Sequence, residues 1–202
     1  PCTSFAVTSA KPSEGKSLTA ANIAISYAML GKKVLLIDAD MRKPTQRRLW
    51  RVEKPTGLCD FLAKISKLEL DKVKDLPLWI VCTGTIPPNP SELLSSERMK
   101  HFVEESAKVY DYIIIDTPPI NTVADAQIVS TYVDGVVLVV KSGDTTEDEL
   151  NEAIDAVRRA GGNLCGTVLN DLNMKSVKYA YKYKYGGKYG YKYSYSESYE
   201  AR

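Results

Sequence analysis

The segment Ala10-Lys-Pro-Ser-Glu-Gly-Lys-Ser17 constrains the fold of this chain more than any other feature. It lies between residues 5–8, whose apolar character predicts a strand, and residues 16–30, which predict a helix. A Gly-Lys-Ser triplet at a strand-to-helix junction is typical of a loop that binds phosphate groups. Ala10 departs from the consensus, because it occupies the place of the first glycine. The segment therefore predicts an α/β domain built around a nucleotide.

Each residue of the Gly-Lys-Ser triplet has its own part in phosphate binding. Gly15 permits the backbone to approach phosphate closely, and Lys16, which we expect at the surface of the site, would bind the β- and γ-phosphates. Ser17 would bind Mg²⁺ and begin a helix whose N-terminus faces the anion. The residues expected to surround ATP are Pro12, Ser13, Glu14, Gly15, Lys16, Ser17 and Leu18.

Carboxylates end two further apolar runs. Val34-Leu-Leu-Ile-Asp-Ala-Asp-Met-Arg42 places Asp38 and Asp40 on one side of a continuing strand, because strand side chains repeat every two residues. Two like charges so close need a cation, or the pKa of one must rise. Asp116 ends Tyr112-Ile-Ile-Ile-Asp116, which is typical of a Walker B strand that contacts Mg²⁺ directly or through water. The predicted metal ligands are Ser17, Asp38, Asp40 and Asp116, and the predicted catalytic residues are Lys16, Asp38, Asp40 and Arg42.

Apolar runs alternate with helical patterns along the rest of the chain. This order predicts a mostly parallel sheet with helices on both faces, as in P-loop NTPases, and ligands in such folds bind beyond the carboxyl ends of the strands. The expected strands are residues 5–8, 33–37, 78–81, 112–115, 135–140 and 165–169, and the expected helices are residues 16–30, 58–67, 91–108, 125–132 and 146–160.

The C-terminal residues differ in composition from the rest of the 202-residue chain. Residues 175–202 carry a charge of +5, which leaves −3 on residues 1–174 and argues against a nucleic-acid-binding body. With almost no aliphatic residue to form a core, residues 175–202 are predicted to be a disordered tail after one P-loop domain at residues 1–174. Their tyrosines are Tyr179, Tyr181, Tyr183, Tyr185, Tyr189, Tyr191, Tyr193, Tyr195 and Tyr199.

Cysteine spacing and hydropathy favour a cytoplasmic protein. The four cysteines form no C-x-x-C pair, so reduced thiols are expected rather than a zinc site or a disulfide framework. No apolar run reaches the roughly 18 residues of a membrane span, and no signal peptide is visible. The chain begins without Met and close to its first strand, as a fragment of a longer protein would.

Together these motifs resemble the bacterial tyrosine kinases of capsule and exopolysaccharide biosynthesis, which are related to the MinD and ParA ATPases. The resemblance comprises a variant Walker A at residues 9–17, a Walker A′ at residues 37–42, a Walker B at residues 113–119 and the tyrosine cluster. It implies autophosphorylation of the tail tyrosines between neighbouring subunits, with ATP and Mg²⁺. It further implies Asp38 as the base and Asp40 at the metal, although these two roles could be exchanged.

The same resemblance implies partners and a place in the cell. We expect a transmembrane polysaccharide co-polymerase adaptor that activates the kinase at the inner face of the membrane. A cognate tyrosine phosphatase, a ring of unphosphorylated subunits and regulation of polysaccharide polymerisation and export are also implied. The E-x-x-R-x-x-R pattern that this family carries before its first strand does not occur here. Asn170 lies where relatives place an adenine-binding amide, or it is a turn residue before Asp171.

Two other functions are compatible with the phosphate loop. Lys11 occupies the place of the signature lysine of MinD and ParA, so an ATPase switch that binds a membrane or partner proteins is the alternative. A nucleotide-binding regulatory module, with the tail as an interaction segment, is the third possibility. The tail could also bind single-stranded nucleic acid through stacking and charge, but its attachment to a Mg–ATP site favours tyrosines that accept phosphate.

Overall fold

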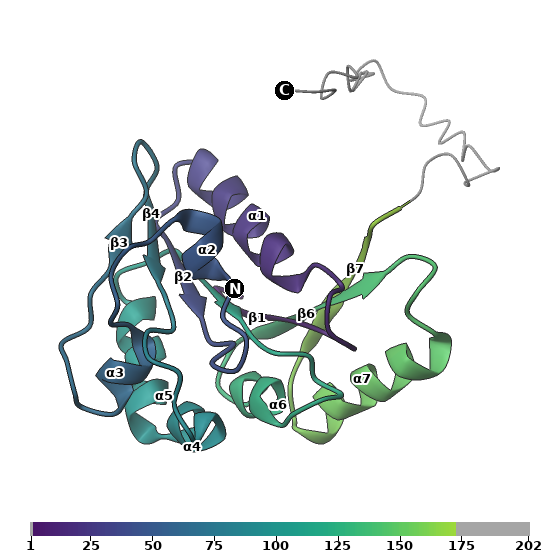
Figure 1. The fold of residues 1–202 in the computed structure, drawn as a ribbon. Coiled ribbons are helices and arrows are strands. Elements are labelled where there is room, and N and C mark those ends of the chain that lie inside the picture. The colour runs from purple at the N-terminus through teal and green to yellow at the C-terminus, as the bar shows by residue number, and fades with distance from the viewer. Residues whose placement is uncertain (1, 173–202) are drawn as a thin grey trace, which may run out of the picture. The chain divides into compact units, whose positions relative to one another are not determined.

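The apolar runs of the sequence form one seven-stranded sheet in the computed structural model, which describes residues 2–172 (Figure 1). The strand order is β3-β4-β2-β5-β1-β6-β7, and only β3 is antiparallel to its neighbour. This confirms the predicted P-loop fold with a mostly parallel sheet. The strands are β1 (Ser4–Ser9), β2 (Val34–Asp38), β3 (Asp71–Lys72), β4 (Leu78–Val81), β5 (Tyr112–Asp116), β6 (Gly135–Lys141) and β7 (Leu164–Asn170).

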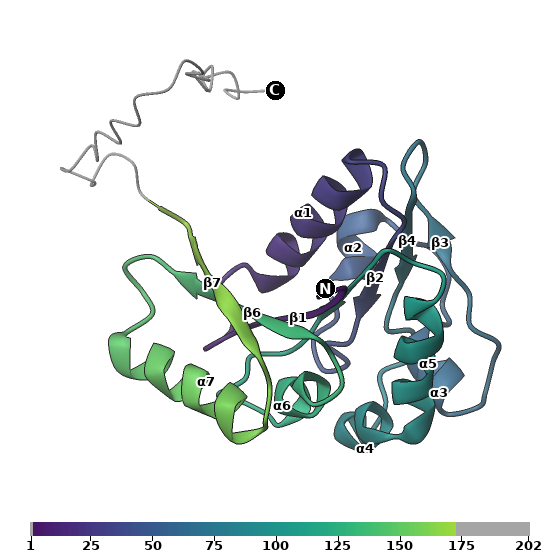
Figure 2. The ribbon, with the colours of Figure 1, turned by 180° about the vertical axis from the view of Figure 1, so that it is seen from behind.

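Helices cover both faces of this sheet, as the alternation of patterns predicted. On one face α1 packs against Val7, Leu36 and Ile114 through its alanines, and Trp50 of α2 joins this cluster. On the other face α3 to α7 pack against Leu35, Ile37 and neighbouring strand residues, an arrangement that Figure 2 shows from behind. The helices are α1 (Lys16–Met29), α2 (Gln46–Trp50), α3 (Leu58–Leu62), α4 (Pro90–Ser95), α5 (Glu97–Ala107), α6 (Asp125–Ser130) and α7 (Glu147–Arg159).

The structure corrects the expected helices at two places. The single helix over residues 91–108 is wrong, because Ser96 has an extended backbone and caps α5 by accepting a hydrogen bond from the Met99 amide. The helix over residues 58–67 ends at Leu62, since Lys64 has a φ of 62°, outside the right-handed helical region. The short helix α2 and the edge strand β3 were not expected at all.

The parallel strands bring the predicted motifs to one edge of the sheet. β1 lies between β5 and β6, so the loop after β1 starts beside the ends of both neighbours. Asp38 and Asp116 are register partners at the ends of β2 and β5. Ligands of open parallel sheets bind at this edge, beyond the carboxyl ends of the strands.

None of the helices formed by residues 2–172 is both long and apolar enough to cross a membrane. The predicted domain boundary at residue 174, the disorder of the tail and all nine phosphoacceptor tyrosines lie outside the described residues. They remain predictions.

Candidate active site

The loop between β1 and α1 has the backbone of a phosphate-binding loop. Ser13 and Gly15 have positive φ values of 67° and 89°, and α1 begins directly at Lys16. L side chains rarely adopt the φ of Gly15, so this position favours glycine, and a Cβ atom there would also lie 2.1 Å from the side-chain nitrogen of Asn170. Ala10 is fully buried, and its φ is not among the positive values of the described residues. The backbone conformation at this position is therefore one that alanine can adopt, and the loop does not need the consensus glycine there.

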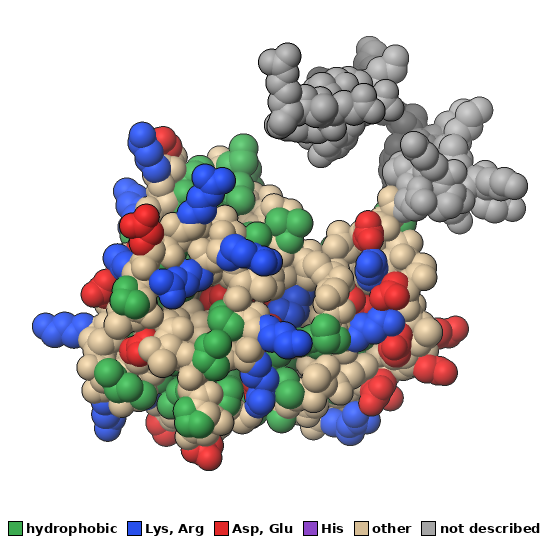
Figure 3. Space-filling model, viewed as in Figure 1, with side chains coloured by type: hydrophobic (Ala, Val, Ile, Leu, Met, Phe, Trp, Pro, Cys, Tyr) green, Lys and Arg blue, Asp and Glu red, His purple; other side chains and the backbone are tan. Residues whose placement is uncertain are grey.

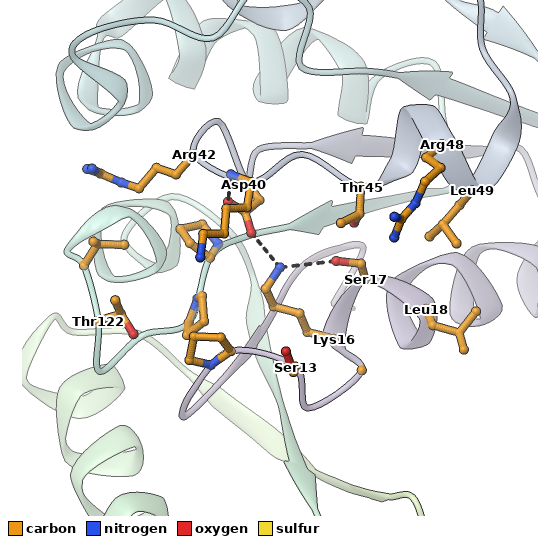
Figure 4. A pocket seen from close by; sticks show the side chains of 16 residues that line it. Ser13, Lys16, Ser17, Leu18, Asp40, Arg42, Thr45, Arg48, Leu49 and Thr122 are labelled. Atoms are coloured by element: carbon orange, nitrogen blue, oxygen red, sulfur yellow. Dashed lines mark hydrogen bonds and ion pairs between the residues drawn. The ribbon is translucent and has the colours of Figure 1, made fainter.

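Lys16 is buried among carboxylates, which corrects the expectation that it lies at the surface. Its Nζ lies 2.8 Å from Asp40 Oδ2, 3.5 Å from Asp116 Oδ1 and 3.2 Å from Ser17 Oγ (Figure 4). The Lys16 side chain is 10% exposed, and Asp116 is fully buried. The structure thus assembles Lys16, Ser17, Asp40 and Asp116 within hydrogen-bond distance, as the three motifs predicted.

Burial and like charges shift the pKa values of this cluster. Burial alone would lower the pKa of Lys16, but the Asp116 and Asp40 carboxylates raise it above its ordinary value. Burial, together with the charges of Asp116 and Asp40, raises the pKa of Asp38 to about 8. Burial also raises the pKa of Asp116, although Lys16, Ser17 and Gln46 oppose that shift. Lys16 is therefore charged, and Asp38 holds a proton near neutral pH in the protein alone.

Gln46 is a site residue that sequence reasoning missed. Its side-chain nitrogen donates to Asp116 Oδ2 at 2.8 Å and to the Ser17 carbonyl at 2.9 Å, and its backbone amide donates to Asp38 Oδ2. Trp50 Nε1 donates to the Gln46 side-chain oxygen and so fixes the orientation of the amide. The only signal in the sequence is that Gln46 follows the Asp-Ala-Asp-Met-Arg segment closely.

Arg42 lines the cavity, but its guanidinium does not face Lys16. It donates to Asp125 through Nε at 2.8 Å and Nη2 at 3.1 Å, and Ser91 Oγ donates to the same carboxylate at 2.6 Å. In Figure 4 Arg42 extends away from Lys16 and Asp40. In this arrangement Arg42 connects the segment after β2 to α4 and α6. For its predicted catalytic role at a transferred phosphate, the guanidinium would have to leave Asp125.

Glu14 and Asn170 brace the phosphate loop from outside the cavity. The buried Glu14 carboxylate accepts hydrogen bonds from the Lys11 amide at 2.9 Å and from the Thr145 hydroxyl. Asn170 Nδ2 donates to the Glu14 carbonyl at 3.0 Å. Of the predicted nucleotide-contacting residues, Glu14 can thus offer its backbone only. The predicted contact of Asn170 with adenine stays a prediction, since its amide group is bonded to the loop here.

A cavity of about 400 Å³ lies beside this cluster. The predicted residues Pro12, Ser13, Gly15, Lys16, Ser17, Leu18, Asp40 and Arg42 line it, together with Lys43, Thr45, Arg48, Leu49, Pro118, Pro119, Thr122 and Val123. Asp38 is fully buried behind Thr45 and Gln46, which both donate backbone hydrogen bonds to its Oδ2. Direct contact between Asp38 and a substrate therefore requires residues 43–46 to move.

The donor atoms of the cluster fit Mg²⁺ in the presence of a nucleotide. Asp38 Oδ1 is buried without a hydrogen-bond partner, and carboxylate and hydroxyl oxygens are the ligands that Mg²⁺ prefers. No three His, Cys, Asp or Glu side chains of residues 2–172 are arranged to hold a metal ion by themselves. Mg²⁺ usually takes one or two carboxylates and completes its shell with phosphate oxygens and water.

We expect Asp38→Asn to stabilise the nucleotide-free, metal-free protein at pH 8. Because native Asp38 keeps its proton up to about pH 8 while an unfolded Asp releases it near pH 4, the unfolding free energy falls as pH rises between these values. Asparagine cannot ionise, so the unfolding free energy of the variant does not fall in this way as the pH rises. Thermal unfolding in EDTA should show a Tm at least about 2 °C above wild type at pH 8, the shift for roughly 1 kcal/mol in a domain of this size, and a smaller difference at pH 5.

Asp75→Asn is the matched control for that measurement, because Asp75 is exposed in a turn. The Tm of Asp75→Asn should equal the Tm of wild type at both pH values. A Tm of Asp38→Asn equal to or below wild type at pH 8 would show that Asp38 is ionised in the folded protein.

Comparison with known proteins places this site in a family. Residues 3–163 match the family described as AAA domain. Tyrosine-protein kinase YwqD of Bacillus subtilis is 45% identical over 181 residues, which cover 88% of this chain and 76% of that protein. The kinase domain of Escherichia coli tyrosine kinase ETK has a TM-score of 0.83 and 33% identity, covering 90% of this chain and 72% of that chain.

The MinD alternative is not favoured by these comparisons or by the position of Lys11. The cell division ATPase MinD of Pyrococcus furiosus is only 20% identical at a TM-score of 0.70, over 84% of this chain and 72% of that chain, so the likeness concerns the fold alone. Lys11 Nζ lies 3.1 Å from Glu149 of α7 and donates to the Asp144 carbonyl at 2.9 Å. The lysine that suggested this alternative thus contacts the α7 side of the loop and does not line the cavity.

Proposed function

The chain belongs to the AAA-domain family and, within it, to the bacterial tyrosine-protein kinases, and from this premise we propose that it phosphorylates tyrosines of its own C-terminal segment. The phosphoryl donor is ATP, and the acceptors are the nine tyrosines from Tyr179 to Tyr199. The observation that carries the proposal is the Lys16–Asp40–Asp116 cluster beside an open cavity, in a chain that also supplies the acceptors.

The reaction moves one phosphoryl group between two oxygens. The bond from the γ-phosphorus to the β–γ bridging oxygen breaks, a bond to the tyrosine oxygen forms, and ADP leaves. The phenolic proton passes to a carboxylate, for which Asp38 is suited by its unpartnered Oδ1. Its pKa of about 8 leaves Asp38 protonated in the protein alone, but Mg²⁺ bound nearby would lower this pKa toward the operating pH, so that the ionised carboxylate can take the proton. Lys16 offsets phosphate charge, and Mg²⁺, once bound near Ser17, Asp40 and Asp116, would supply further positive charge.

The partners of this activity follow from the family. We propose that a transmembrane adaptor holds the kinase at the inner face of the membrane and activates it. Unphosphorylated subunits would associate in a ring, a tyrosine phosphatase would reverse the modification, and the cycle would regulate capsule or exopolysaccharide polymerisation and export. The composition of the body, at −3, gives no support for a nucleic-acid partner.

We expect transfer between subunits. A full-length Lys16→Met chain, which supplies acceptor tyrosines, is mixed with an active chain that lacks residues 179–202. After incubation with Mg–ATP, intact mass spectrometry should show phosphate on the Lys16→Met chain in steps of one phosphoryl group. The physical reason is that residues 179–202, if fully extended at about 3.3 Å per residue, would span more than the width of a domain and so could reach a neighbouring subunit.

The control replaces the truncated active chain with a truncated Lys16→Met chain, and this mixture should stay unlabelled. An unlabelled full-length chain, while the truncated chain phosphorylates an added tyrosine copolymer, would contradict transfer between subunits. No phosphotyrosine in full-length wild type, together with phosphate release, would identify an ATPase switch instead. Nucleotide binding with no turnover would identify a regulatory module.

A further inference from the structure

The cavity beside Lys16 combines apolar walls with a cationic rim. Leu18 and Leu49 are 54% and 42% exposed although they line the cavity, and Pro118, Pro119 and Val123 complete the apolar wall. An aromatic ring fits such a surface. Lys43 and Arg48 are exposed lining residues, and in Figure 3 lysine and arginine side chains gather over α2 and beside it.

The positive charge of this rim is not balanced by the described part of the protein. Asp40 is the one acidic side chain that lines the cavity, and it is bonded to Lys16. Asp125 takes the charge of Arg42. No acidic side chain of residues 2–172 lies within ion-pair distance of Lys43 or Arg48. These two cations are therefore available to a bound segment.

The acceptor tyrosines differ in the charge of their neighbours. Between residues 175 and 193 there are six lysines and no acidic residue. Residues 194–202 contain Glu197 and Glu200, and their only basic residue is Arg202 at the end of the sequence. Tyr195 precedes Glu197 by two positions, and Tyr199 lies between the two glutamates. The tail thus offers two classes of tyrosine, seven with basic or neutral surroundings and two with acidic ones.

We propose that Lys43 and Arg48 select tyrosines with acidic neighbours, so that Tyr195 and Tyr199 are phosphorylated before the tyrosines among the lysines. The inference rests on the proposed function and names the preferred acceptors of that site. Lysine-flanked tyrosines are disfavoured at first, because their lysines face cations in the cavity. Each phosphate then adds about −1.5 to −2 charges and makes the neighbouring tyrosine a better acceptor, so the modification advances from Tyr199 toward Tyr179.

The test follows site occupancy in the full-length wild-type protein with Mg–ATP, sampled before one phosphate per chain has accumulated. Mass spectrometry of the tail gives the ratio of phosphate on Tyr195 and Tyr199 to phosphate on Tyr181 and Tyr183. We expect a ratio of about 5 or more at low salt, the scale for two exposed charge pairs, and a ratio closer to 1 in 0.5 M NaCl. The ratio does not depend on the total rate.

Charge reversals identify the residues responsible. Arg48→Glu and Lys43→Glu should each lower the ratio several-fold, and so should Glu197→Lys combined with Glu200→Lys. Lys32→Glu is the matched control, because Lys32 is exposed before β2, at the opposite edge of the sheet, and its ratio should equal wild type.

Three results would overturn the selection. One is equal early occupancy of both classes, another is earlier phosphate on Tyr181 and Tyr183, and the third is a ratio that Arg48→Glu and Lys43→Glu leave unchanged. In each case total phosphotyrosine still forms, so the kinase function survives while the selection fails. Absence of phosphotyrosine from every site would overturn both.

Discussion

Lys16→Met is expected to reduce phosphotyrosine formation by roughly 10²–10³-fold or more, the scale for removing one preorganised charge-stabilising group. Methionine keeps the length of the side chain but leaves the transferring phosphoryl group without its buried cation. Asp40 and Asp116 lose the same cation, at 2.8 Å and 3.5 Å, so nucleotide phosphates would meet uncompensated carboxylates. Intact mass before and after incubation with Mg–ATP measures the loss.

Because Lys16 is buried, this variant needs a test of folding beside the test of activity. Removing one partner of a buried ion pair destabilises a protein, so the Tm should fall while circular dichroism at 20 °C stays that of wild type. Lys11→Met is the matched control, since Lys11 lies in the same loop but contacts Glu149 of α7. It should keep most of the activity. Near wild-type labelling of folded Lys16→Met would show that this loop does not bind the transferred phosphate.

The sequence predicted the sheet and the cluster because both depend on local patterns. Apolar runs that end in Asp38 and Asp116 indicate buried parallel strands, and parallel strands must bring those ends to one edge. Gly15 is needed for a left-handed backbone, which a Gly-Lys-Ser motif already indicates. Such inferences need only the spacing of residues and the geometry of strands.

The contacts that the sequence did not predict join segments that are distant along the chain. Gln46 bonds to Asp116, 70 positions away, and Arg42 bonds to Asp125, 83 positions away. No periodic pattern marks α2, because a helix of five residues is too short to show helical spacing. The burial of Lys16 was missed for the same reason: its partners come from separate strands and loops.

Asp38→Asn and Asp40→Asn should each slow transfer by about 10²-fold or more, but through different steps. An asparagine in place of Asp38 would keep an oxygen for the Thr45 and Gln46 amides and lose only the ability to take a proton. The slow rate of this variant should therefore persist at high Mg²⁺ concentration. Asp40 lines the cavity and pairs with Lys16, so its loss should raise the Mg²⁺ requirement, and excess Mg²⁺ should restore part of the rate.

Single-turnover rates measured across Mg²⁺ concentrations, beside nucleotide affinity, separate these two roles. Affinity should weaken less than transfer in both variants, because proton acceptance and metal positioning act mainly on the transition state. If excess Mg²⁺ instead rescues Asp38→Asn and leaves Asp40→Asn slow, the base and metal roles are exchanged, in line with the open position of Asp40 on the cavity wall. Wild-type rates in both variants would remove the carboxylate pair from the mechanism and leave Lys16 balanced by Asp116 alone.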